Sequence, residues 1–138
     1  KISKRNLYLA NNIKLALKLG LDGVYIPSFN KKINFTLNTS LPNKFEILGS
    51  AHNTNEIKIK KLQGCSKIFI SPIFKTNKTK KFLSVTKFNL MTLNQKSDFV
   101  ALGGINKSNY RKLKLTKIVG FAGISWIKKN GLKKLGRF

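Results

Sequence analysis

Cysteine and acidic residues are scarce in this chain of 138 residues. Cys65 is the only cysteine, so no disulfide can form within the chain, and we expect a reducing, cytoplasmic compartment. No charged-then-apolar segment at the start resembles a signal peptide, and no apolar run approaches the roughly 18 residues of a membrane helix. The sequence therefore predicts no membrane partner.

The few groups that could carry acid–base or metal chemistry are dispersed. The four acidic residues form no acid–base couple by sequence, and His52 is the only histidine. A lone histidine is more often a hydrogen-bonded structural residue than a catalyst, and Cys65 has no histidine beside it. The sequence thus contains no Cys/His metal cluster, and we interpret His52 and Cys65 as structural residues.

Positive charge is abundant, with 28 lysines and arginines against those four acids. Such a surface attracts polyanions, which makes a basic nucleic-acid-binding protein one alternative. However, arginine occurs only at Arg5, Arg111 and Arg137, and the lysines spread along the whole chain. Dedicated binders use more arginine and intersperse aromatic residues, so we favour compositional drift and expect no specific nucleic-acid partner.

Short apolar runs alternate with segments of helical periodicity. The predicted strands cover residues 6–10, 23–26, 46–51, 67–71, 98–104 and 118–125. Helices are predicted over 11–20, 53–64, 82–95 and 107–115, with a last short helix from Trp126 onward. Asn11 or Asn12 and Asn53 or Thr54 are expected N-caps, and Gly20 and Gly64 end their helices.

This alternation predicts an α/β protein with a parallel sheet. Two architectures compete, an open doubly wound sheet and a (β/α)8 barrel. Six strands are too few for a closed barrel, so the length alone favours the open sheet. If two units are missing, the barrel is the better interpretation.

Hydroxyl, amide and lysine side chains follow the predicted strands, where parallel α/β proteins place their sites. Gly103 and Gly104 follow the fifth strand, and Ser125 ends the sixth. A glycine pair there marks either a turn with positive φ or a place where a ligand approaches the backbone. Together these residues suit a phosphorylated ligand.

Five segments, in order, resemble the thiamine phosphate synthase/TenI family: "YLANNIKLALKLGLDGVYI", "ILGSAHNTNE", "FISPIFKTNKTK", "VALGGINKSNY" and "GFAGISWI". The resemblance spans Leu7 to about Ile127. It implies one domain over residues 1–138, a (β/α)8 TIM barrel that is incomplete here, with six units corresponding to strands three to eight. It also implies a transferase of thiamine biosynthesis, which joins hydroxymethylpyrimidine diphosphate to thiazole phosphate and releases pyrophosphate.

The resemblance also implies roles for individual residues, and its partners are small phosphorylated substrates. Thiazole phosphate would be held by Gly104, Ile124 and Ser125. The thiazole side would be lined by Thr76, Asn77 and Lys78. The pyrimidine diphosphate would face Ser50 and either Lys78 or Lys80. Lys60 lies on a face of the predicted helix over 53–64, and we expect Lys60→Ala to change thiazole phosphate binding little.

The chain departs from the family pattern at the metal site. The family's Mg²⁺-binding aspartates fall at Asn11 and Asn30, and an amide brings no charge to Mg²⁺. The asparagine before the first aspartate falls at Ala10, and the first two units, with their Gln-x-Arg-x-Lys segment, are absent. Pro72 stands where the synthases, unlike the tautomerases, have proline. A non-catalytic phosphate-ligand-binding barrel that has lost its metal site is therefore the main alternative.

Overall fold

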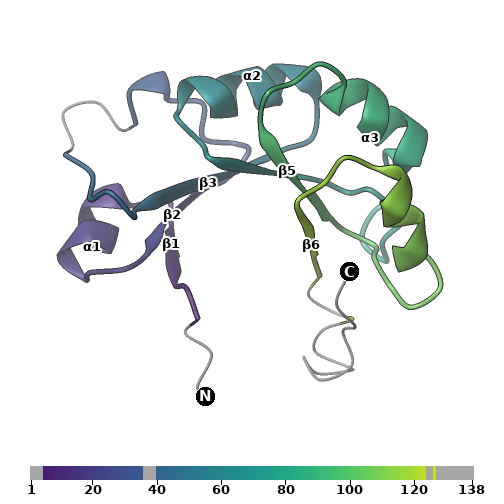
Figure 1. The fold of residues 1–138 in the computed structure, drawn as a ribbon, viewed down its shortest axis with the longest axis horizontal. Coiled ribbons are helices and arrows are strands. Elements are labelled where there is room, and N and C mark those ends of the chain that lie inside the picture. Colours follow the sequence, from purple (N-terminus) through teal and green to yellow (C-terminus); the bar gives the residue numbers. More distant parts are fainter. Residues whose placement is uncertain (1–4, 36–39, 124–125, 127–138) are drawn as a thin grey trace. The chain divides into compact units, whose positions relative to one another are not determined.

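The computed structural model describes residues 5–35, 40–123 and 126. Six strands occur there in one sheet that follows chain order: β1 (Tyr8–Ala10), β2 (Gly23–Ile26), β3 (Glu46–Ala51), β4 (Lys67–Ile70), β5 (Asp98–Leu102) and β6 (Gly120–Ala122). Between them lie helices α1 (Ile13–Lys18), α2 (Thr54–Leu62) and α3 (Ser84–Thr92), and the 3-10 helices η1 (Ile33–Phe35) and η2 (Tyr110–Leu115) (Figure 1). The β1–β2, β2–β3 and β5–β6 pairs are parallel, which confirms the predicted α/β fold.

The sequence signals at the helix ends are confirmed. The Asn12 side chain caps α1 by accepting a hydrogen bond from the Leu15 N–H at 3.0 Å, and Gly20 follows with φ +62°. Asn53 caps α2 in the same way through the Glu56 N–H at 2.9 Å. The Glu56 carboxylate in turn accepts a hydrogen bond from the His52 N–H, just before the N-cap, so the first turn of α2 is bonded in both directions.

The segment after β5 differs from its predicted form. The helix expected over 107–115 is a 3-10 helix that begins only at Tyr110. The Asn106 side chain accepts hydrogen bonds from the Ser108 N–H and hydroxyl, and such local bonds compete with a regular helix. β6 is shorter than predicted, and Ile124, Ser125 and the residues after Trp126 lie outside the described residues.

The chain forms two compact units, which we describe separately. The first unit comprises Lys1–Phe69 with Lys96–Asp98, and the second comprises Ile70–Gln95 with Phe99–Phe138. In the first unit α2 packs on β3, and the fully buried side chains include Ala16, Val24, Ile26 and Ile57. In the second unit Phe88 of α3 and Leu113 of η2 are buried, and the Asn89 amide donates to the Leu115 carbonyl at 2.9 Å.

The two faces of β3 differ in chemistry. Gly49 lies against α2, so strand alternation places Glu46, Leu48 and Ser50 on the opposite face. There Glu46 accepts hydrogen bonds from Tyr8 and from Lys67, with which it forms an ion pair. The bond from Lys67 lowers the pKa of Glu46, while burial and the bond to Glu46 raise the pKa of Tyr8.

Lys60 lies on α2, as the sequence predicts, and the small effect of Lys60→Ala on thiazole phosphate binding stays a prediction. Its side chain is fully buried, and its stem passes directly over Gly49. A β-carbon at Gly49 would lie 2.8 Å from Lys60 Cδ and 2.6 Å from Cys65 Sγ. Cys65 is a buried free thiol, as predicted, and burial raises its pKa to about 11.

No helix in the described ranges has the length and apolar character needed to cross a membrane.

Candidate functional site

The glycine pair after β5 forms a tight turn in the second unit. Gly103 and Gly104 have φ values of +92° and +71°, a region that glycine adopts without steric penalty. A β-carbon at Gly103 would lie 2.8 Å from Pro72 Cβ. At Gly104 it would lie 2.4 Å from the Phe74 carbonyl oxygen and 2.5 Å from that of Lys75. Both glycines are therefore required by the turn itself.

The same turn leaves hydrogen-bond donors available. Among the described residues, no loop or turn carbonyl accepts a hydrogen bond from the backbone N–H groups of Gly104 or Ile105. The turn is fixed from the other side by Asn109, whose amide donates to the Gly104 carbonyl at 2.8 Å and whose Oδ1 accepts from the Asn106 N–H. Two successive N–H groups after the carboxyl end of a strand can bind the oxygens of an anion.

The loop between β4 and α3 lies against this turn. The Ile73 and Phe74 N–H groups donate to the carbonyls of Leu102 and Gly103 at 3.0 and 3.1 Å. The Thr76 hydroxyl then accepts a hydrogen bond from the Thr79 N–H, which closes a turn around Asn77 and Lys78. Gly104 thus lies against Phe74 and Lys75, the residues directly before Thr76, and Asn77, Lys78 and Lys80 are exposed.

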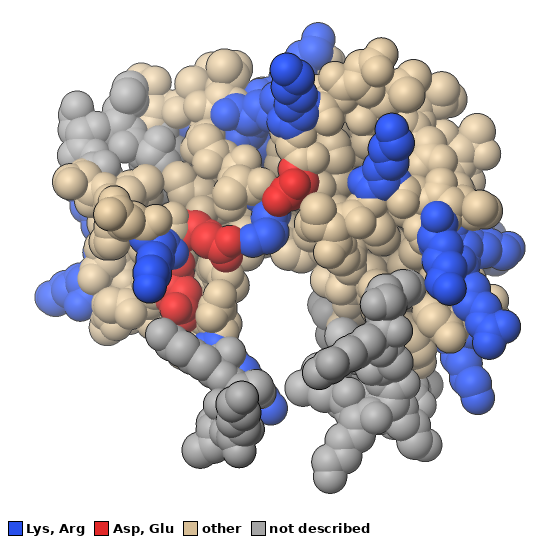
Figure 2. All heavy atoms as spheres, viewed as in Figure 1, with Lys and Arg blue, Asp and Glu red and all other residues tan. Residues whose placement is uncertain are grey.

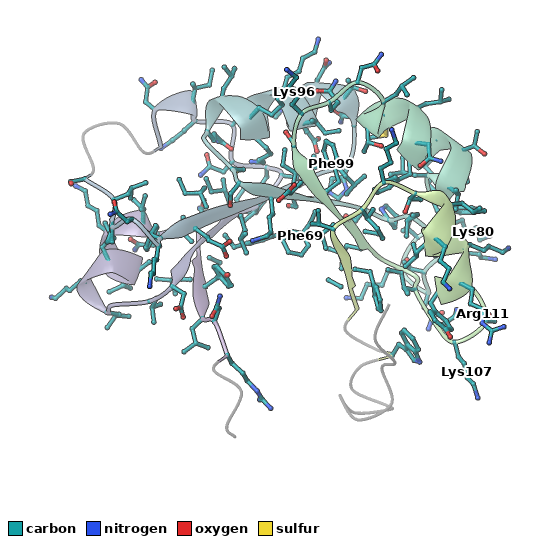
Figure 3. All side chains as sticks on the ribbon, viewed as in Figure 1. Phe69, Lys80, Lys96, Phe99, Lys107 and Arg111 are labelled. Carbon is teal, nitrogen blue, oxygen red and sulfur yellow. The ribbon has the colours of Figure 1, made fainter. Side chains whose placement is uncertain are left out.

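Basic side chains are distributed widely. Figure 2 shows lysine and arginine at several separate places on the visible face, without one continuous stripe. In the second unit, Lys80, Lys107 and Arg111 project outward along one margin in the view of Figure 3. Lys107 and Arg111 therefore add positive charge that the motifs did not single out.

In the first unit, Ser50 and the two asparagines occupy the ends of three strands. Ser50 is buried near the carboxyl end of β3. Asn11 follows β1 with φ +59°, and Asn30 lies in the loop after β2. The Asn30 amide nitrogen donates to Asn11 Oδ1 at 2.6 Å, and Asn30 Oδ1 accepts from the Lys32 N–H at 3.0 Å.

This asparagine pair does not fit Mg²⁺. Each side-chain oxygen already accepts a hydrogen bond, and neither carries charge. Mg²⁺ is usually held by one or two carboxylates together with water and substrate phosphates. Across the part of the chain that the structure describes, no three or more His, Cys, Asp or Glu side chains gather where they could bind a metal.

Two features of the candidate site escaped prediction. Asn109 stands in the motif that follows the glycine pair, five residues after Gly104, a spacing that allows a side chain to return to the turn. Lys60 on α2 and Gln63, the C-cap residue of that helix, are polar residues three apart, and both are fully buried. Gly49 could have indicated the buried lysine from the sequence, because a glycine in a buried strand leaves room for a long side chain from a neighbouring helix.

Comparison with known proteins identifies the family. The sequence pattern of the thiamine monophosphate synthase family matches residues 3–127. Thiamine-phosphate synthases of Prochlorococcus marinus and Clostridium tetani are 33% and 31% identical to this chain and align with 91% and 88% of it. The chain spans only 37% and 58% of the length of these two relatives.

Solved structures show the same fold. A thiamine phosphate pyrophosphorylase from Pyrococcus furiosus matches with a TM-score of 0.67 at 20% identity, over 85% of this chain and 55% of that one. The thiamine phosphate pyrophosphorylase from Bacteroides thetaiotaomicron matches with a TM-score of 0.55 at 20% identity, over 95% and 61%. The parallel α/β sheet, the glycine turn and the match over residues 3–127 agree, and the chain belongs to the thiamine monophosphate synthase family.

Proposed function

We propose that this chain carries thiamine phosphate synthase chemistry, joining hydroxymethylpyrimidine diphosphate to thiazole phosphate. The family match over residues 3–127 is the observation that carries the proposal, because it includes the glycine turn and the adjoining loop. In this proposal the chain is one domain, and its six strands correspond to strands three to eight of a (β/α)8 barrel.

The thiazole phosphate binds at the glycine turn. The N–H groups of Gly104 and Ile105 bind its oxygens, a role supported by the lack of a loop or turn carbonyl that accepts from them among the described residues. Ile124 and Ser125 complete this subsite, and Thr76, Asn77 and Lys78 line the thiazole side. The closeness of the Thr76 loop to Gly104 supports this arrangement.

The pyrimidine diphosphate faces Ser50 and a lysine of the exposed loop, either Lys78 or Lys80. During the reaction the bond between the pyrimidine methylene carbon and the diphosphate oxygen breaks, and pyrophosphate leaves with the electron pair. The thiazole nitrogen then forms the new bond to that carbon. The chain positions the two substrates and stabilises the leaving anion with lysine charge. Because the asparagine pair does not fit Mg²⁺, no step here depends on that ion.

The test is synthesis by the purified chain. Both substrates are incubated with it, with and without Mg²⁺, and thiamine phosphate and pyrophosphate are measured by mass spectrometry. We expect product, and we expect alanine at the lysine that faces the diphosphate, Lys78 or Lys80, to lower kcat/KM by about tenfold or more. A lost hydrogen bond to a charged oxygen costs about 1.5–3 kcal/mol, which corresponds to roughly that factor.

The matched control is Lys58→Ala, an exposed lysine on α2, which should leave kcat/KM unchanged. Calorimetry with thiazole phosphate alone distinguishes a synthase from a barrel that binds the phosphate without catalysis. Binding without product would favour the non-catalytic barrel, and neither binding nor product would contradict the proposal altogether.

A further inference from the structure

A lysine in the first unit reaches from α2 to the loop after β2. Lys60 leaves α2 on its buried side, crosses β3 at Gly49 and is fully buried. Its ammonium donates three hydrogen bonds: to the Pro27 carbonyl at 2.8 Å, to the Asn30 carbonyl at 2.8 Å and to Gln63 Oε1 at 2.9 Å. Lys60 therefore joins α2 to the loop after β2 at two points, the carbonyls of Pro27 and Asn30.

Gln63 extends this contact. It is fully buried, and its amide nitrogen donates to the Asn30 carbonyl and to the Lys32 carbonyl, both at 3.0 Å. The Asn30 carbonyl thus accepts from two side chains of the same helix. Lys60 and Gln63 thus bind three carbonyls of a six-residue loop, those of Pro27, Asn30 and Lys32, and the Pro27 carbonyl also accepts from the Asn30 N–H at 3.1 Å.

The held loop carries one of the two asparagines at the family's metal positions. The Asn30 carbonyl is bound by Lys60 and Gln63, and the Asn30 side-chain nitrogen donates to Asn11 Oδ1 at 2.6 Å. Its side-chain oxygen is engaged by the Lys32 N–H within the same loop. The orientation of the Asn11–Asn30 pair therefore depends on where the loop backbone lies.

Simple packing does not account for a lysine at this position. An apolar side chain could follow the same path over Gly49 without the cost of burying an ammonium, which is large unless the charge is hydrogen-bonded. All three acceptors of Lys60 are neutral, and burial lowers its pKa. Unlike an apolar side chain, the ammonium donates hydrogen bonds to the carbonyls of Pro27 and Asn30.

We propose that Lys60 and Gln63 are positioning residues, which fix the loop after β2 so that Asn30 is held against Asn11 at the pyrimidine diphosphate side of the site. This inference rests on the proposed function for its catalytic consequence. Its structural content, the dependence of the asparagine pair on Lys60, can be measured without activity.

The experiment compares Lys60→Met with Lys58→Met in the whole chain. Methionine keeps the apolar stem at position 60 and removes the ammonium, whereas Lys58 on the same helix is exposed. The side-chain amide resonances of Asn11 and Asn30 are followed by two-dimensional NMR. We expect both to shift in Lys60→Met, to stay unchanged in Lys58→Met and to return toward their parent positions in Lys60→Arg.

Kinetics supply the second measurement. In Lys60→Met we expect kcat/KM for the pyrimidine diphosphate to fall by about tenfold or more, because misplacing a contact by 1 Å costs up to ~10²-fold. The KM for thiazole phosphate should remain unchanged, since its residues lie in the second unit. If the parent makes no product, the proposed function fails, while the resonances still decide whether Lys60 positions Asn30.

A milder variant covers the case in which Lys60→Met does not fold. Gln63→Glu keeps an acceptor for Lys60 but replaces the donor to the Asn30 and Lys32 carbonyls with a carboxylate that repels them. The same two resonances should shift in this variant. Unchanged Asn11 and Asn30 resonances in a folded Lys60→Met or Gln63→Glu protein would overturn the inference.

Discussion

Replacing Gly104 with alanine should destabilise the protein for two separable reasons. The residue has φ +71°, where a β-carbon is disfavoured, and that β-carbon would also lie 2.4 and 2.5 Å from two backbone carbonyl oxygens. Those oxygens belong to Phe74 and Lys75, whose loop is hydrogen-bonded to the turn. The loop can therefore relieve the collision only by giving up part of its own bonding.

The expected cost follows from these two contributions. The left-handed conformation costs about 1–2 kcal/mol for a residue with a β-carbon. The loop must also shift to relieve the collision, and losing one of its backbone hydrogen bonds adds about 0.5–1.5 kcal/mol. A loss of about 2–3 kcal/mol corresponds to a fall of roughly 6–15 °C in the melting temperature of a chain of this size.

Two other glycines separate the contributions. Gly20 has φ +62° with no atom within 4 Å of its β-carbon position, so Gly20→Ala should show the conformational cost alone. Gly120 also has open space around that position and lacks the positive φ, so Gly120→Ala should change the melting temperature little. Thermal and urea unfolding, followed by circular dichroism, measure all three variants. A Gly104→Ala protein as stable as Gly120→Ala would refute the argument.

Two further predictions concern titratable groups. The bond from Lys67 lowers the pKa of Glu46 below its ordinary value of 4.5, so the carboxylate contributes stability above that pH and loses it as the pH falls through the lowered pKa. Glu46→Gln should therefore be less stable than the parent at pH 7, with a difference that shrinks below pH 4.5; urea titrations that show a constant difference would contradict this. Burial raises the pKa of Cys65 to about 11, so iodoacetamide should alkylate the folded protein at pH 8 about 100-fold or more slowly than free cysteine. Mass spectrometry measures the rate, and alkylation as fast as that of free cysteine would show that the thiol is accessible.

Local sequence patterns were sufficient for most of the fold. The strands at 23–26 and 46–51 have the predicted bounds, because short apolar runs between glycine, proline and helix caps leave few alternatives. The caps at Asn12 and Asn53 follow from side chains that bond within three residues. Features of this kind depend only on neighbouring residues, which a single sequence contains.

The features that were missed depend on hydrogen bonds that helical periodicity does not reveal. In the sequence Lys60 looks like any other lysine of a basic helix. Two of its three acceptors, the Pro27 and Asn30 carbonyls, belong to the loop after β2, thirty or more residues earlier in the chain. The η2 segment has a helical pattern, but hydrogen bonds around Asn106 delay its start. Tertiary context therefore decided burial at Lys60, whereas local side-chain hydrogen bonds decided where η2 begins.

The glycine turn shows why the binding site must be tested through side chains. A turn whose N–H groups bind phosphate and a turn with a purely structural role both require glycine at position 104. The glycine therefore does not distinguish between these two roles. Any larger residue at Gly104, however, collides with the carbonyls of Phe74 and Lys75. Weaker ligand binding in a Gly104→Val protein would therefore follow from damage to the turn alone, whereas alanine at exposed Lys78 alters the charge beside the turn and leaves its backbone intact.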